Sequence, residues 1–228
     1  MPRQPLMKRY PDVIPTFGPG FLEDRPEAAA IIARCIALWS EVESELARLL
    51  AIILGANTEA AIAVFLSIQS SRAQSEALHA AARVVLNERD YELFTALMTM
   101  AYSVEKDRNA LAHGRFGGSD LIPEGVIWIH PVDLTRHTVT VSATKVTDEA
   151  MERLRSKVFV YELADLETIA RDIENVHKQI MFFIGYLVSR QTNPPASDEW
   201  REQRYRQLCA EPRIQQALSN LRGDKQKR

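Results

Sequence analysis

The stretch DYELFTALMTMAYSVEKDRNALAHG, residues 90–114, predicts a long helix and shows where that helix ends. Its apolar residues recur at steps of three or four, the spacing at which side chains share one face of an α-helix. Arg108 occupies one of these apolar-face positions, five residues before His113. Because a glycine just past a helix is typical of a left-handed cap, we expect Gly114 to adopt one and the helix to end at His113. The apolar positions are Leu93, Leu97, Ala101, Val104 and Leu111.

The residues before this stretch predict three more helices. The first covers residues 26–54, with Trp39 and Glu43 one turn apart on its apolar face. The carboxylate of Glu43 therefore points toward the core or its edge, and a buried role and a side chain that reaches water both remain open. Shorter helices are predicted at residues 57–68 and 70–86, the second with a capping-box spacing at its start.

The residues after this stretch predict a β-hairpin and then a return to helix. GVIWIHPVD and HTVTVSAT are rich in β-branched residues and partly alternating, which favours a hairpin at about residues 125–144. An apolar stripe from Leu166 to Leu187 then predicts another long helix. We expect a mainly α fold, in which a helical bundle with an inserted β-hairpin (residues 22–192) lies between a flexible leader (1–21) and a basic helical tail (193–228).

Composition limits the class of protein. Of the 228 residues, 46% are hydrophobic and 25% are charged, as in a globular protein with one sizeable core. Cys35 and Cys209 lie in no zinc-binding spacing, and free cysteines suit a reducing compartment. The N-terminus lacks the apolar core of a signal peptide, and no apolar stretch is long enough to span a bilayer. We therefore expect a cytoplasmic protein that does not associate with membranes.

Charge is distributed unevenly along the chain. The net charge is −2, which argues against indiscriminate coating of nucleic acid. Residues 201–228 nevertheless carry a net charge of +5, because six Arg and two Lys oppose three acidic residues. This tail is open to two interpretations, attraction of phosphate backbones or a solvated charged helix.

The end of the predicted helix at residues 90–113 carries the residues with the clearest chemistry. Residues five apart on a helix are separated by about 140° around the axis and about 7.5 Å along it, so Arg108 and His113 are not a same-face pair. The long arginine arm, uncoiling at Gly114 or a second copy of the helix can bring them together. Asn109 adds an amide that can orient either side chain or a substrate. No His, Cys, Asp or Glu cluster has metal-ligand spacing, so no metal is expected.

These features resemble a known family. An all-helical chain whose fourth main helix ends in RNALAHG is similar to the HEPN domain (higher eukaryotes and prokaryotes nucleotide-binding), in which an Arg and a polar residue precede a His by an RxxxxH spacing. WSEVESELARLL, which contains Trp39 and Glu43, looks like the first long helix of uncharacterised bacterial proteins of this group. The resemblance covers residues 25–190 in helix order, with the expected hairpin as an insertion.

The resemblance implies a metal-independent endoribonuclease that acts as a homodimer without a cofactor, often in toxin–antitoxin or antiphage settings. RNA is then the substrate, and an antitoxin or another protein is a candidate partner. The chemistry fits the residues, because His113 can transfer a proton and Arg108 can stabilise charge on the phosphorane. Asn109 would orient these groups, while Glu43 and Gly114 would support the site, Glu43 by pairing with Arg108.

A second interpretation comes from a different class of function. The same helical dimer can bind a nucleotide, RNA or a protein without cutting it. Arg108 then caps carbonyls or pairs with Glu43, and His113 only ends the helix. The acidic first 200 residues, with a net charge of −7, are not an obvious RNA-binding surface, and this keeps the alternative open.

Overall fold

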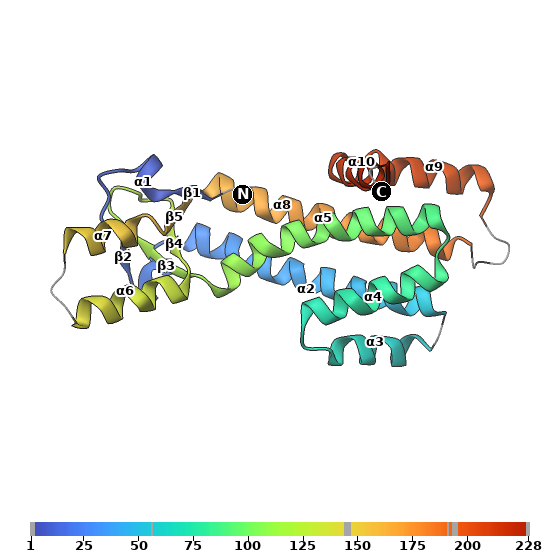
Figure 1. Cartoon of the computed structure of the whole chain (residues 1–228), viewed down its shortest axis with the longest axis horizontal. Coiled ribbons are helices and arrows are strands. Elements are labelled where there is room, and N and C mark those ends of the chain that lie inside the picture. Colours follow the sequence, from blue (N-terminus) through green and yellow to red (C-terminus); the bar gives the residue numbers. More distant parts are fainter. Residues whose placement is uncertain (1–2, 56, 144–146, 191, 193–195, 227–228) are drawn as a thin grey trace. The chain divides into compact units, whose positions relative to one another are not determined.

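The computed structural model describes residues 3–55, 57–143, 147–190, 192 and 196–226 (Figure 1). The chain forms two compact units. The first contains Met1–Leu38 and Glu105–Asp172, and the second contains Trp39–Val104 and Ile173–Arg228. The described residues are mainly helical, with one small antiparallel sheet that lies in the first unit. The mainly α fold class is therefore confirmed.

The long helices predicted from apolar periodicity are present. Each predicted apolar stripe is buried, from Leu93 to Leu111 in one helix and from Leu166 to Leu187 in another. Two of the shorter helices begin at side-chain caps, because Asn57 and Ser70 accept hydrogen bonds from backbone N–H groups three residues on. The bounds are Pro26–Leu54 for α2, Thr58–Ser67 for α3, Ser71–Val85 for α4, Glu88–His113 for α5 and Leu163–Val188 for α8.

The N-terminal segment that we expected to be a flexible leader is part of the fold. It provides both edge strands of the sheet, and the side chain of Leu6 is fully buried in the sheet core. Strands of two residues leave no periodic pattern that could reveal them. The elements are β1 (Gln4–Pro5), α1 (Leu6–Arg9), β2 (Thr16–Phe17) and the 3₁₀ helix η1 (Pro19–Leu22).

The sheet has the order β1-β5-β4-β3-β2, and every pairing is antiparallel. Its inner strands are β3 (Arg115–Gly118), β4 (Val126–Ile129) and β5 (Val158–Tyr161). Ile127 and Ile129 of β4 join one hydrophobic cluster with Leu154 of α7 (Asp148–Arg155). The alternate residue Trp128 points to the opposite face, as the period of two in a strand requires. Because all four β4 residues are buried, both faces of the sheet are covered.

The predicted β-hairpin at residues 125–144 is wrong in its second half. Residues Pro131–Ala143 form the helix α6, and residue 144 lies outside the described residues. β4 already pairs with β3 on one side and β5 on the other, so no edge is free for another strand. Pro131 is favoured in a first helical turn, and the hydroxyls of Thr138 and Thr140 donate to carbonyls one turn back. These local interactions allow β-branched residues to remain helical.

The C-terminal tail is helical as predicted, and it packs through apolar residues while its described charged side chains are half-buried or exposed. It forms α9 (Asp198–Cys209) and α10 (Pro212–Gln226), which lie side by side in the second unit (Figure 1). Leu208 and Ile214 are fully buried. Several of its charges are paired, including Arg206 with Glu202 at 3.1 Å. Within the described chain, no helix has both the length and the apolar character needed to cross a membrane.

Candidate functional site

The last two turns of α5 carry the residues that the sequence singles out. The side chain of Arg108 is half-buried, and its Nη1 donates a 3.0 Å hydrogen bond to Oδ1 of Asn109. Its Nε is buried and has no hydrogen-bond acceptor among the described residues. A buried donor without an acceptor is unfavourable, so this Nε requires an acceptor that the described residues do not supply.

His113 is the last residue of α5 and is exposed. The helix continues to its end without distortion, because the N–H of Gly114 still donates to the carbonyl of Ala110 at 3.0 Å. No uncoiling therefore moves His113 toward Arg108 on the same helix. The two side chains share the end of one helix but lie on different sides of it, as their spacing of five residues requires.

Gly114 does not form the left-handed cap that we expected. Among the described residues, Gly55 is the one with a positive φ. The glycine is required instead by a close approach: a Cβ at position 114 would lie 1.7 Å from Nε1 of Trp128. That indole nitrogen donates a 2.8 Å hydrogen bond to the carbonyl of Ala110, inside the motif. Trp128 of β4 thus holds the end of α5 against the sheet, and the chain passes directly from the helix into β3.

We expect Gly114→Ala to destabilise the first unit by about 1–3 kcal/mol, the usual range for overpacking. The added methyl group must displace the indole, which also breaks the hydrogen bond to Ala110. Chemical denaturation measures the loss. Gly20→Ala is the matched control, because a Cβ at position 20 meets no atom within 4 Å. Equal effects of the two substitutions would contradict the role assigned to Trp128.

A second layer of side chains lies behind the motif, on the same face of the sheet as Trp128. The guanidinium of Arg3 stacks on Trp128, with its carbon 4.2 Å from the ring centre, and on Phe159 at 4.6 Å. Burial raises the pKa of Tyr161 to about 12, while Arg3 acts to lower this pKa and Asp107 to raise it. Sequence reasoning missed this layer, because its members come from residues 3, 107, 128, 159 and 161.

Glu43, which we expected to pair with Arg108, belongs to the second unit, whereas Arg108 belongs to the first. Its carboxylate is half-buried and accepts a 2.9 Å hydrogen bond from Nε1 of Trp39, one turn earlier on α2. This hydrogen bond explains why Glu43 lies on the same face of α2 as Trp39. A pairing of Glu43 with Arg108 stays a prediction.

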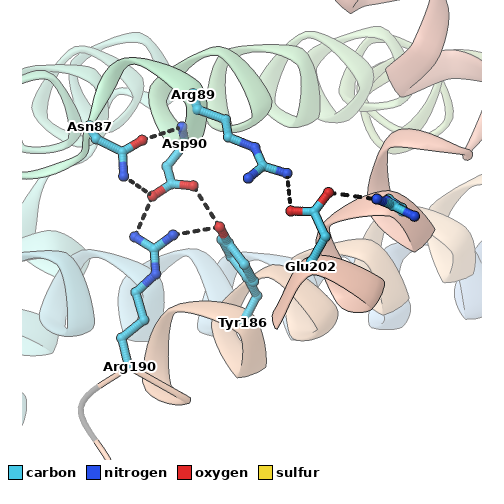
Figure 2. A network of polar contacts seen from close by, with 7 residues as sticks. Asn87, Arg89, Asp90, Tyr186, Arg190 and Glu202 are labelled. Carbon is cyan, nitrogen blue, oxygen red and sulfur yellow. Dashed lines mark hydrogen bonds and ion pairs between the residues drawn. The ribbon is translucent and has the colours of Figure 1, made fainter. Parts of the chain in front are cut away.

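The second unit contains a buried polar network that the sequence analysis did not identify (Figure 2). Asp90 is fully buried. Its carboxylate accepts hydrogen bonds from Nδ2 of Asn87 at 2.8 Å, from the hydroxyl of Tyr186 at 2.8 Å and from the guanidinium of Arg190. Since the network satisfies both carboxylate oxygens, we interpret it as a structural link between α5 and α8.

Within the described residues, no group of three His, Cys, Asp or Glu side chains is placed to bind a metal ion.

Comparison of the chain with protein-family models, with curated proteins and with solved structures gives no significant match. The resemblance to the HEPN domain therefore rests on the residues of the motif and on their position at the end of α5.

Proposed function

We propose that the protein is a metal-independent endoribonuclease of the HEPN type that acts as a homodimer, with Arg108, Asn109 and His113 as its catalytic residues. The observation that carries this proposal is the end of α5. There an exposed imidazole follows, by five residues, a half-buried guanidinium whose Nε has no acceptor among the described residues.

The proposed reaction uses the two side chains in different roles. His113 accepts the proton of a ribose 2′-hydroxyl, the 2′-oxygen attacks the adjacent phosphorus, and the bond from phosphorus to the 5′-oxygen breaks. The leaving 5′-oxygen takes up a proton from water, and the products are a 2′,3′-cyclic phosphate and a 5′-hydroxyl. Arg108 donates hydrogen bonds to the phosphorane oxygens, and charge-assisted bonds of this kind are the stronger ones. Asn109 keeps the guanidinium oriented through its hydrogen bond.

The positions of these groups on one helix support the proposed homodimer. Because Arg108 and His113 lie about 140° apart around α5, one copy of the helix presents them in different directions. Two copies related by a twofold axis would place Arg108 of one protomer near His113 of the other. An antitoxin or another protein partner would regulate such an enzyme.

The test is incubation of the purified protein with a short RNA in excess EDTA. We expect cleavage to continue and to leave 2′,3′-cyclic phosphate ends, detected by mass spectrometry. A substrate with a single ribonucleotide in a 2′-deoxy strand should be cut only after that ribonucleotide. Cleavage of the all-deoxy strand, or loss of all cleavage in EDTA, would overturn the proposed chemistry.

The alternative is a non-catalytic helical dimer that binds a nucleotide, RNA or a protein. The Arg108–Asn109 hydrogen bond favours this alternative, because it already uses an N–H donor of Nη1 that a phosphate would otherwise accept. RNA that binds but is recovered intact, with and without added Mg²⁺, would establish it.

A further inference from the structure

Helix α6 lies between two pockets of the first unit. The α6–β3 pocket has a volume of about 620 Å³ and is bounded by α6, by the start of β3 and by residues 17–22. The α6–α7 pocket is smaller, about 90 Å³, and is bounded by α6, α7 and the residues just after α7. Figure 1 shows α6 and α7 side by side next to the sheet.

The α6–β3 pocket combines an aromatic wall with polar groups. Phe17 lines it and packs against the hydrophobic core of the sheet, which keeps this wall in place. The exposed side chains of Arg115 and Thr138 provide a cation and a hydroxyl. The pocket reaches Gly114, the residue that follows His113. A nucleobase matches such a lining, because its faces stack on aromatic rings and its edges take hydrogen bonds.

The α6–α7 pocket is predominantly basic. Arg136, Arg153 and Lys157 line it together with the single acidic residue Asp133, which forms a 3.5 Å salt bridge with Arg136. In the part of the chain that the structure describes, the exposed side chains of Arg153 and Lys157 form no salt bridge. Two cations that form no salt bridge with the described residues, beside a small pocket, match the charge of a phosphate group.

The two pockets lie on opposite sides of α6. Residues 133, 136, 137 and 140 line the α6–α7 pocket, and residues 134, 135, 138 and 139 line the α6–β3 pocket. At about 100° per residue, the centres of these two sets are about 180° apart around the helix. A flexible chain that crosses the exposed side of α6 would therefore reach both pockets.

We propose that α6 is the substrate-binding helix of the protein and that single-stranded RNA crosses it. The α6–β3 pocket takes one base beside the end of α5, and the α6–α7 pocket takes a backbone phosphate of a neighbouring nucleotide. This inference rests on the proposed function for the identity of the ligand. Its evidence is separate, because none of the pocket-lining side chains is a proposed catalytic residue.

The phosphate contact is tested by binding of a short fluorescein-labelled 2′-O-methyl oligouridylate, which has no 2′-hydroxyl to attack and cannot be cut by the proposed route. Fluorescence anisotropy measures the affinity at several salt concentrations. Each phosphate contact on a single strand contributes about 0.7 to the slope of log affinity against log salt, so the double variant Arg153→Ala/Lys157→Ala, which removes the one proposed contact, should lower that slope by about 0.7. Between 50 and 200 mM salt, the ratio of wild-type to variant affinity should fall by about 2.6-fold.

The matched control is Arg48→Ala/Arg72→Ala, which removes the same charge from exposed residues of α2 and α4. The salt slope of this control should stay at the wild-type value. An equal change in both double variants would overturn the inference, since only net charge would then matter. Equally tight binding of polyglutamate would also overturn it, because the pocket would then be a site for an acidic protein.

The base contact is tested by Thr138→Trp, which fills the α6–β3 pocket from its exposed side. We expect the affinity for the oligouridylate to fall on the order of tenfold, the range of one lost base–aromatic stack. The affinity for an abasic strand of equal length should not change. Val132→Trp is the control, because Val132 is exposed on α6 and lines neither pocket. Equal losses for both strands, or no loss for either, would overturn the base contact.

The binding and cleavage experiments can reject the two proposals separately. Pocket-dependent binding without cleavage in EDTA would retain α6 as the RNA-binding helix and reject the ribonuclease. Cleavage that is insensitive to the α6 variants at low RNA concentration would retain the ribonuclease and reject this inference.

Discussion

Replacing His113 by alanine is expected to lower the rate of RNA cleavage by about two to four orders of magnitude, the usual contribution of a general acid or base. His113 is exposed at the end of α5, so its removal should leave the fold intact. Single-turnover kinetics with saturating protein measure the chemical step directly. The matched control is His177→Ala, which removes a histidine from the middle of the α8 sequence, far from the helix ends, and should keep the wild-type rate.

Arg108→Ala should reduce the same rate by about two to three orders of magnitude, the effect of losing one preorganised donor to a developing negative charge. Because the two residues act in one step, the double variant should be little slower than His113→Ala alone. Wild-type rates in either single variant would reject the proposed site. Unfolding of Arg108→Ala would instead support a structural role, and Arg108→Lys, which keeps the charge but not the planar fork, separates these outcomes.

The helices could be predicted because their evidence is local. Apolar residues at steps of three and four in α2, α5 and α8 report directly on which side is buried, and all three helices are present. The same local reading was wrong for residues 137–143, where β-branched residues form α6 and not a strand. These residues cannot form a strand next to β4, because β4 already pairs with β3 and β5. Both partner strands lie outside residues 125–144, so the pattern within that stretch could not reveal them. β1 and β2, each of two residues, carry no signal in the sequence.

The candidate site shows the same limit. The sequence places Arg108, Asn109 and His113 at the end of a helix, and the structure agrees with this placement. The sequence alone does not reveal that Trp128 lies against Gly114, because that contact joins residues on different elements of the fold. Within the Asp90 network, Asn87 is close to Asp90 in the sequence, and its Oδ1 accepts the N–H of Asp90 as in a helix cap. Tyr186 and Arg190 are about a hundred residues away and could not be paired with Asp90 by spacing.

The largest expected effect on stability comes from Asp90. Its carboxylate is fully buried and holds Tyr186, Arg190 and Asn87 through hydrogen bonds and an ion pair (Figure 2). Removing one member of a buried ion pair usually costs about 3–5 kcal/mol, because its partner is left without compensation. The side chain of Arg190 is 32% exposed and can turn partly to water, so we expect Asp90→Ala to lower the free energy of unfolding by about 3 kcal/mol, near the lower limit.

Denaturant unfolding measures this loss as a lower midpoint with an unchanged slope. Glu76→Ala removes an exposed ion pair with Arg72 and serves as the matched control, with little change expected. Combining Asp90→Ala with Arg190→Ala should recover part of the loss, since no unpaired guanidinium then remains beside Tyr186. Strictly additive effects of the two substitutions would show that the ion pair does not couple α5 to α8. RNA cleavage by Asp90→Ala below its unfolding range should match the wild type, because the network contains none of the proposed catalytic residues.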